Sequence, residues 1–166
     1  MSHELLFPII ENINTVKEAY PGKKELQKTV YLLQKKGLDL GYSYRFYFYG
    51  PYSDSLDEDI KRLSILGELE IYQDDLTHRI RIPDHKEYCS GSNDNTIHLI
   101  HKTIDELKDI SPRDLELMAT IVFLADDCIV TEEEIIKKVH AVKGDKYCDN
   151  EIREHYEILK AKEYII

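Results

Sequence analysis

Three polar side chains within residues 95–109 have the types and spacing that could hold a metal ion. His98, His101 and Asp105 are three and four residues apart, so a helix would place them on one face. Two imidazoles and a carboxylate could bind zinc and leave a coordination position open for a substrate. No fourth ligand and no His-Glu-x-x-His pattern accompanies them. We therefore expect this face to be ordinary solvated helix surface.

The remaining reactive side chains point to no catalytic centre. His140, Cys148 and His155 invite the same metal hypothesis and lack a recognisable ligand motif in the same way. The chain has three cysteines, Cys89, Cys128 and Cys148. Their odd number and wide spacing argue against a disulfide framework and against a zinc finger. The glycines form no phosphate-binding loop. We expect a protein that is not an enzyme and needs no metal or cofactor.

Two kinds of macromolecular contact are better supported. Nucleic acid is bound by cations that face phosphates, and the candidates for this role are Lys24, Lys28, Arg79 and Arg81. Tyrosine and arginine are enriched in the residues that dominate protein–protein binding. The candidates for a partner surface are Arg45, Tyr47, Tyr49 and Tyr52. These same side chains could instead pack beneath the second half of the chain, and the sequence leaves both interpretations open.

The aromatic run at residues 44–49 predicts a strand, because aromatic residues suit a pleated surface. Alternation would place Tyr44, Phe46 and Phe48 in the core and the intervening residues at a half-exposed face. Gly50-Pro51 would then turn the chain. Either Ser53 or Ser55 would cap the following helix, Ser55 in a capping box with a Glu58 partner.

Apolar spacing and capping signals predict the other elements. Helices are expected at residues 3–19, 24–36, 57–66, 95–109, 112–125, 132–142 and 150–161. Residues 69–72 and 78–82 read as a hairpin around Asp74-Asp75, and residues 164–166 as a short closing strand. Thr131 and Glu134 should form a capping box.

This order predicts an α+β fold, mainly helical, of the winged-helix kind. Residues 1–83 would form the winged-helix-like domain with its small β-sheet and wing hairpin. The polar residues 84–94 would be a loop or linker, and residues 95–166 a helical half packed on the first. The helix-to-strand pattern near the end of each half suggests that the second is a degenerate winged-helix repeat.

The charge is unevenly distributed along the 166 residues, whose net charge is −10. Residues 1–50 hold seven basic and five acidic residues, whereas residues 84–166 hold eleven and nineteen, a net of −8. The second half would repel DNA or bind a basic surface. No apolar run reaches the roughly 20 residues of a membrane span, and the N-terminus lacks a basic leader. We expect a cytoplasmic protein with no membrane association.

Two segments carry a family resemblance. The helix Leu26-Gln27-Lys28-Thr29-Val30-Tyr31-Leu32-Leu33 and the junction Phe48-Tyr49-Gly50-Pro51-Tyr52-Ser53 resemble the YwgA-like bacterial and archaeal proteins over roughly residues 20–82. More distantly, they resemble the Panacea or SocA-type antitoxin domain, in which a similar Gly-Pro follows a strand. The resemblance implies a winged-helix-like domain found among regulators, antitoxins and phage-defence neighbourhoods. It implies no reaction, cofactor or catalytic residue.

Together these observations predict a non-enzymatic cytoplasmic protein, regulatory or antitoxin-like, that acts by binding another protein. In one mechanism the acidic second half, including Glu132, Glu133 and Glu134, would cover a basic surface on a toxin or effector. The alternative is a winged-helix transcriptional regulator that contacts DNA through its basic second helix and wing. That alternative predicts a homodimer and a binding constant that falls steeply with salt.

Overall fold

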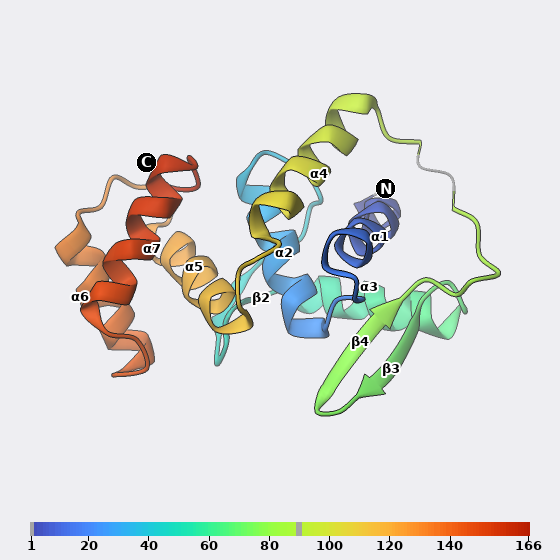
Figure 1. The fold of residues 1–166 in the computed structure, drawn as a ribbon, viewed down its shortest axis with the longest axis horizontal. Helices are drawn as coiled ribbons and strands as arrows, with labels where there is room; N and C mark the ends of the chain where they lie inside the picture. The colour runs from blue at the N-terminus through green and yellow to red at the C-terminus, as the bar shows by residue number, and fades with distance from the viewer. Residues whose placement is uncertain (1, 89–90) are drawn as a thin grey trace. The chain divides into compact units, whose positions relative to one another are not determined.

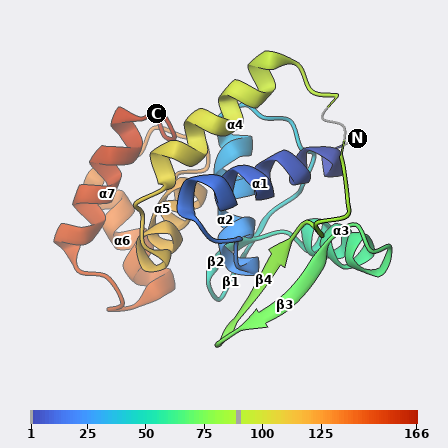
Figure 2. The ribbon, with the colours of Figure 1, turned by 45° about the vertical axis from the view of Figure 1, so that its right-hand side comes forward.

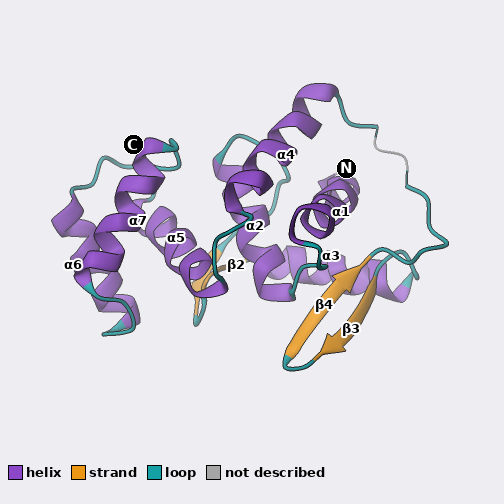
Figure 3. Ribbon diagram, in the orientation of Figure 1, coloured by secondary structure: helices purple, strands orange, loops and turns teal. Residues whose placement is uncertain are grey.

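A computed structural model describes residues 2–88 and 91–166. Within these residues the chain forms seven α-helices, a short 3-10 helix and two antiparallel hairpins, which confirms the mainly helical α+β class (Figures 1 and 3). The elements are η1 (Ser2–Leu5), α1 (Leu6–Lys17), α2 (Lys23–Lys35), β1 (Arg45–Tyr47), β2 (Gly50–Tyr52), α3 (Asp54–Ile65), β3 (Glu70–Asp74), β4 (Thr77–Arg81), α4 (Asp94–Leu107), α5 (Pro112–Ala125), α6 (Glu132–Lys143) and α7 (Asp149–Ala161).

The chain divides into two compact units. The N-terminal unit comprises Met1–Arg45 and Tyr52–Asp109, and the C-terminal unit comprises Phe46–Pro51 and Ile110–Ile166. Residues 95–109 were expected in the second half of the chain, after a linker at residues 84–94. Helix α4, which contains most of them, instead belongs to the N-terminal unit. Ile100 and Ile104 of α4 are buried in the same apolar cluster as Leu6 and Ile10 of α1. Cys89, expected in that linker, lies outside the described residues.

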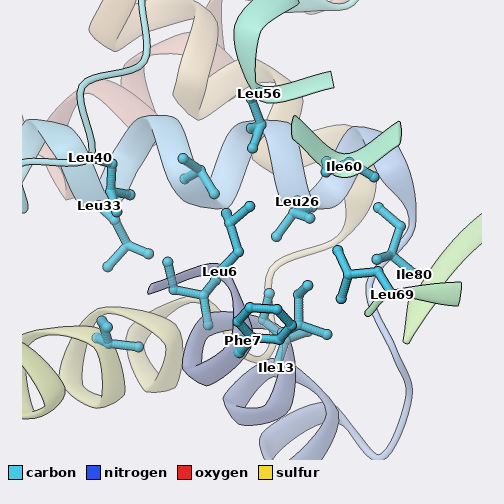
Figure 4. Close-up of a cluster of buried hydrophobic side chains, with 14 of the residues drawn as sticks. Leu6, Phe7, Ile13, Leu26, Leu33, Leu40, Leu56, Ile60, Leu69 and Ile80 are labelled. Carbon is cyan, nitrogen blue, oxygen red and sulfur yellow. The ribbon is translucent and has the colours of Figure 1, made fainter. Parts of the chain in front are cut away.

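The core of the N-terminal unit brings its helices and its hairpin together. Figure 4 shows Leu6 and Phe7 of α1 beneath Leu26 of α2, with Ile60 of α3 and Ile80 of β4 close by. The central residues of α2, from Leu26 to Leu33, are all buried. Helix α2 is therefore covered on more than one side, whereas an amphipathic stripe would have left one face in water.

The predicted wing is confirmed. Strands β3 and β4 pair antiparallel from Glu70 opposite Arg81 to Asp74 opposite Thr77, and they project from the end of α3 (Figures 1 and 2). The link between α1 and α2 adds a bridge to this sheet: Gly22 pairs with Arg79, and the Ile80 amide donates to the Pro21 carbonyl. A Cβ on Gly22 would lie 2.8 Å from Cγ2 of Thr77, so glycine permits this close approach.

The aromatic segment is not the single strand that alternation predicted. Strands β1 and β2 form a hairpin that turns at Phe48 and Tyr49, and Gly50 and Pro51 lie within β2. A turn breaks the two-residue alternation of side chains. Phe48, which was expected in the core, is consequently 81% exposed.

The capping residues fix where several helices begin. Ser53, rather than Ser55, caps α3, because its hydroxyl accepts from the Leu56 amide at 3.2 Å. The expected Ser55 capping box is therefore wrong, and α3 begins three residues earlier than predicted. In the C-terminal unit the capping box of Thr131 and Glu134 is confirmed.

The C-terminal unit is built on α5, α6 and α7, which bury side chains against one another; these include Leu117, Ile121, Ile135, Val139, Ile152 and Leu159. Residues 144–148 form the turn between α6 and α7. Residues 164–166 are not the strand expected, because the Tyr164 amide bonds back to the Leu159 carbonyl at the end of α7. The repeat hypothesis stays a prediction.

Candidate partner-binding site

The turn of the first hairpin carries the most conspicuous exposed surface of the C-terminal unit. Tyr47, Phe48 and Tyr49, the aromatic turn, are 44%, 81% and 48% exposed. The Tyr47 and Phe48 rings meet edge to face with their centroids 5.1 Å apart. Half-exposure of Tyr47 and Tyr49 was expected from the sequence. The exposure of Phe48 was missed because the turn was expected at Gly50-Pro51, whereas it lies at Phe48 and Tyr49.

The hairpin is fixed to the helices of the C-terminal unit by its inner side chain and its backbone. The Phe46 ring packs against Phe123 of α5 at a centroid distance of 5.6 Å. Lys143, the last residue of α6, lies over the Phe46 ring with its ammonium 5.5 Å from the centroid. The same ammonium donates to the Phe48 carbonyl at 2.8 Å. Phe48 thus projects from a backbone that is held in place.

A buried charge cluster supports this attachment. Glu116 of α5 accepts from Lys143 at 2.7 Å and from Lys146 at 2.8 and 2.9 Å. The Lys143 side chain is 4% exposed and the Glu116 side chain 11% exposed, whereas Lys146 is 41% exposed. Burial raises the pKa of Glu116, but the hydrogen bonds from the two lysines outweigh it and leave the pKa lowered. Glu116 is therefore held as a carboxylate beneath the hairpin.

The turn between α6 and α7 completes the support. Tyr147 is buried and donates its hydroxyl to the Arg113 carbonyl at 3.0 Å, while the Arg113 guanidinium lies 4.4 Å above the Tyr147 ring. Burial, reinforced by the Glu116 charge, raises the pKa of Tyr147. The Lys146 ammonium lies over the rings of both Tyr49 and Tyr147. Lys146 therefore joins the turn to the hairpin.

The partner surface predicted from the sequence is divided between the two units. Tyr47 and Tyr49 belong to the C-terminal unit, whereas Arg45 and Tyr52 belong to the N-terminal unit. Arg45 pairs with Asp54 at the start of α3, with its Nε 2.9 Å from the carboxylate. Tyr52 is half-buried. The candidate surface on the C-terminal unit is therefore the aromatic turn, with Phe48 added.

Two of the three carboxylates of the predicted acidic surface are already bonded to neighbouring groups. Glu132 accepts from Arg153 of α7 at 2.6 Å. Glu134 accepts from the Thr131 amide at 2.7 Å, a bond that lowers its pKa. Glu133 is exposed and takes part in neither interaction. Of the three carboxylates, Glu133 is therefore the one whose charge can be changed without removing a described contact.

The four predicted nucleic-acid contacts do not form one cationic surface. Lys28 is 4% exposed, so it does not present its ammonium to a phosphate backbone as predicted, because α2 is covered around its centre. Arg79 bonds Asp74 at 2.7 Å and the Tyr20 carbonyl at 2.6 Å. Arg81 pairs with Glu70 at 2.7 Å. Lys24 is exposed. Both wing arginines therefore have acidic partners within the wing itself.

The structure does not group the side chains that were considered for metal binding. His98, His101 and Asp105 are exposed on α4. His140 bonds Asp149, whereas His155 bonds the Glu151 carbonyl. Among residues 2–88 and 91–166, no three His, Cys, Asp or Glu side chains are grouped so as to hold a metal ion. No helix in the same residues is both long and apolar enough to cross a lipid bilayer.

Comparison with known proteins identifies a similar protein but no matching family model. No family model matches the chain. A protein of Bacillus subtilis (strain 168), described as "Uncharacterized protein YwgA", is 29% identical to it over 134 residues. The alignment covers 78% of this chain and 79% of the relative, so it reaches beyond residues 20–82, where the resemblance was expected. The chain thus resembles the YwgA-like proteins over most of its length.

Proposed function

We propose that this chain is a non-enzymatic cytoplasmic protein, regulatory or antitoxin-like, that acts by binding another protein through the aromatic turn. The observation that carries the proposal is the 81% exposure of Phe48 between two half-exposed tyrosines. Large aromatic side chains supply much of the binding energy at protein interfaces, because each can bury a large area in a single contact.

The support beneath the turn favours binding over chance exposure. A surface side chain on a mobile loop must be ordered when a partner binds, at a cost in conformational entropy. Here the Phe48 carbonyl is held by Lys143, and Phe46 is packed on Phe123. The hairpin is therefore already ordered in the free protein, so less conformational entropy is lost when a partner binds.

Charge indicates the kind of partner. The C-terminal unit holds eight Lys or Arg residues and thirteen Asp or Glu residues, a net charge of −5. Such an excess steers a basic partner toward it and slows the approach of nucleic acid. A basic protein surface, such as the nucleic-acid-binding face of a toxin or effector, fits this balance. The alternative, DNA binding through the wing, is weakened by the ion pairs of Arg79 and Arg81.

The test compares three forms of the protein: wild type, Phe48→Ala, and Ile129→Ala. Ile129 is a matched control because it is 82% exposed and belongs to the same unit but lies outside the aromatic turn. A partner captured from the native host with the wild type would be purified and its affinity for each form measured by calorimetry. For a residue that dominates the interface, Phe48→Ala should weaken binding at least about 30-fold, which corresponds to about 2 kcal/mol.

Equal affinity of the wild type and the Phe48→Ala variant would refute the assignment of the site. The Glu133→Lys variant tests the electrostatic part separately: it should slow association, and the difference should shrink as salt is added. Recovery of a specific DNA duplex in place of a protein, with salt-sensitive affinity, would favour the transcriptional-regulator alternative.

A further inference from the structure

His140 near the C-terminus of α6 has an acceptor at each of its ring nitrogens. Its Nδ1 lies 2.9 Å from the Gly144 carbonyl oxygen, and its Nε2 lies 2.6 Å from a carboxylate oxygen of Asp149. A carbonyl oxygen and an ionised carboxylate only accept hydrogen bonds. Both ring nitrogens must therefore donate, which a neutral imidazole cannot do. The geometry is that of an imidazolium.

The surroundings of His140 favour the same protonation state. The bonds to Gly144 and Asp149 raise its pKa above the ordinary 6.5, the charges of Asp149 and Asp145 add to this, and desolvation opposes it in part. A cation in the last turn of a helix is also stabilised by the helix dipole. The charged groups that face the ring are thus Asp145 in the turn and Asp149 at the start of α7.

The turn that His140 spans is the one that supports the aromatic turn. Gly144 and Asp149 bracket it, and between them lie Lys146 and Tyr147. Lys146 bonds Glu116 and lies over the Tyr49 ring. Its own carbonyl accepts from Arg113. If residues 144–148 became less ordered, the contacts of Lys146 with Glu116 and with the Tyr49 ring would therefore be disturbed.

We propose that His140 is a pH-sensitive clamp on residues 144–148 that regulates the aromatic turn. As an imidazolium, His140 ties the end of α6 to the first residue of α7. When it loses its proton, one of the two hydrogen bonds is lost, and no imidazolium charge remains to balance Asp145 and Asp149. The turn then loosens and the support that Lys146 gives to Tyr49 weakens. This inference rests on the proposed function of the aromatic turn.

The sign of the effect follows from the direction of the shift. Because the folded protein holds the proton more tightly than the unfolded chain does, the stabilisation is fully present below pH 6.5 and is lost as pH rises through the raised pKa of His140. A partner that requires the ordered hairpin would accordingly bind more weakly on the alkaline side.

A nuclear magnetic resonance titration of the isolated protein tests the clamp without any partner. The His140 ring should titrate above pH 6.5, and amide shifts in residues 46–51 and 144–148 should change with the same midpoint. Asp149→Asn should lower that midpoint, because it removes the charge but leaves an oxygen to accept the hydrogen bond. His140→Lys, which keeps a cation, should make the amide shifts of both segments nearly independent of pH over this range.

The ring signals of His155 must be distinguished from those of His140. His155 has Nδ1 2.8 Å from the Glu151 carbonyl and Nε2 3.6 Å from Asp114, so its ring signals have to be followed individually and His155→Gln used as the control. A His140 midpoint at or below 6.5, or hairpin amides that do not follow it, would overturn the clamp. Neither result depends on whether Phe48 binds a partner, so a failure of the clamp can be told apart from a failure of the proposed function.

Discussion

Removing the carboxylate of Glu116 should destabilise the C-terminal unit by about 3 kcal/mol. In a Glu116→Ala variant, Lys146 can turn its ammonium to water, because that side chain is 41% exposed. Lys143, at 4% exposure, cannot; of the contacts described above it keeps those to the Phe48 carbonyl and the Phe46 ring. Leaving one partner of a buried ion pair uncompensated costs about 3–5 kcal/mol. The two remaining contacts of Lys143 place the cost at the lower end of this range.

The assay is urea unfolding followed by circular dichroism. With a typical slope of about 2 kcal/mol per molar urea, the midpoint should fall by about 1.5 M. Amide hydrogen exchange in α5, α6 and the hairpin locates the loss, and these amides should exchange faster than those of α1 and α2. Glu116→Gln should lie between the wild type and Glu116→Ala, because an amide oxygen still accepts from lysine.

A double variant, Glu116→Leu with Lys143→Met, tests whether the buried, uncompensated charge of Lys143 causes the loss of stability. Replacing both partners of a buried pair by apolar residues of similar size is often nearly neutral. We therefore expect the double variant to lie within about 1 kcal/mol of the wild type. If Glu116→Ala alone changes stability by less than about 0.5 kcal/mol, or if the double variant is as unstable as Glu116→Ala, burial of the Lys143 charge is not the cause.

Two further predictions concern the N-terminal unit, and the same urea assay checks both. Ser53→Ala should cost about 1 kcal/mol because it removes the side-chain cap of α3, whereas Ser55→Ala should cost clearly less; equal losses would contradict the assignment of Ser53 as the cap. Gly22→Ala should cost about 1 kcal/mol or more, because the new methyl would meet Thr77 at 2.8 Å, and adding Thr77→Ser should recover most of the loss by removing the methyl it meets. If the double variant shows no recovery, the contact with the Thr77 methyl is not the cause of the loss.

Sequence reasoning succeeded where the signals are local. The capping box of Thr131 and Glu134 is encoded within four residues, and the wing hairpin in a short alternating segment, so both could be predicted. Lys28 was mispredicted because helical spacing reveals one apolar stripe but not that α2 is covered around its centre. The aromatic hairpin was mispredicted because Lys143, which binds the Phe48 carbonyl, is 95 residues away along the chain.

The same long-range contacts explain why a winged-helix order of elements need not mean a DNA-reading surface. A helix-turn-helix reader joins its second and third helices by a turn of about 3–4 residues. Here residues 36–53 separate α2 from α3, and part of that segment, Phe46–Pro51, is packed into the C-terminal unit. Helix α3 begins with Asp54 and Asp57 in its first turn, and the wing arginines are paired with acids of the wing. The elements that would face DNA are thus close to neutral or acidic, while the inserted hairpin carries the exposed aromatic residues. That redistribution is why we propose the aromatic turn as the binding surface and expect changes there, rather than changes in the wing, to weaken partner binding.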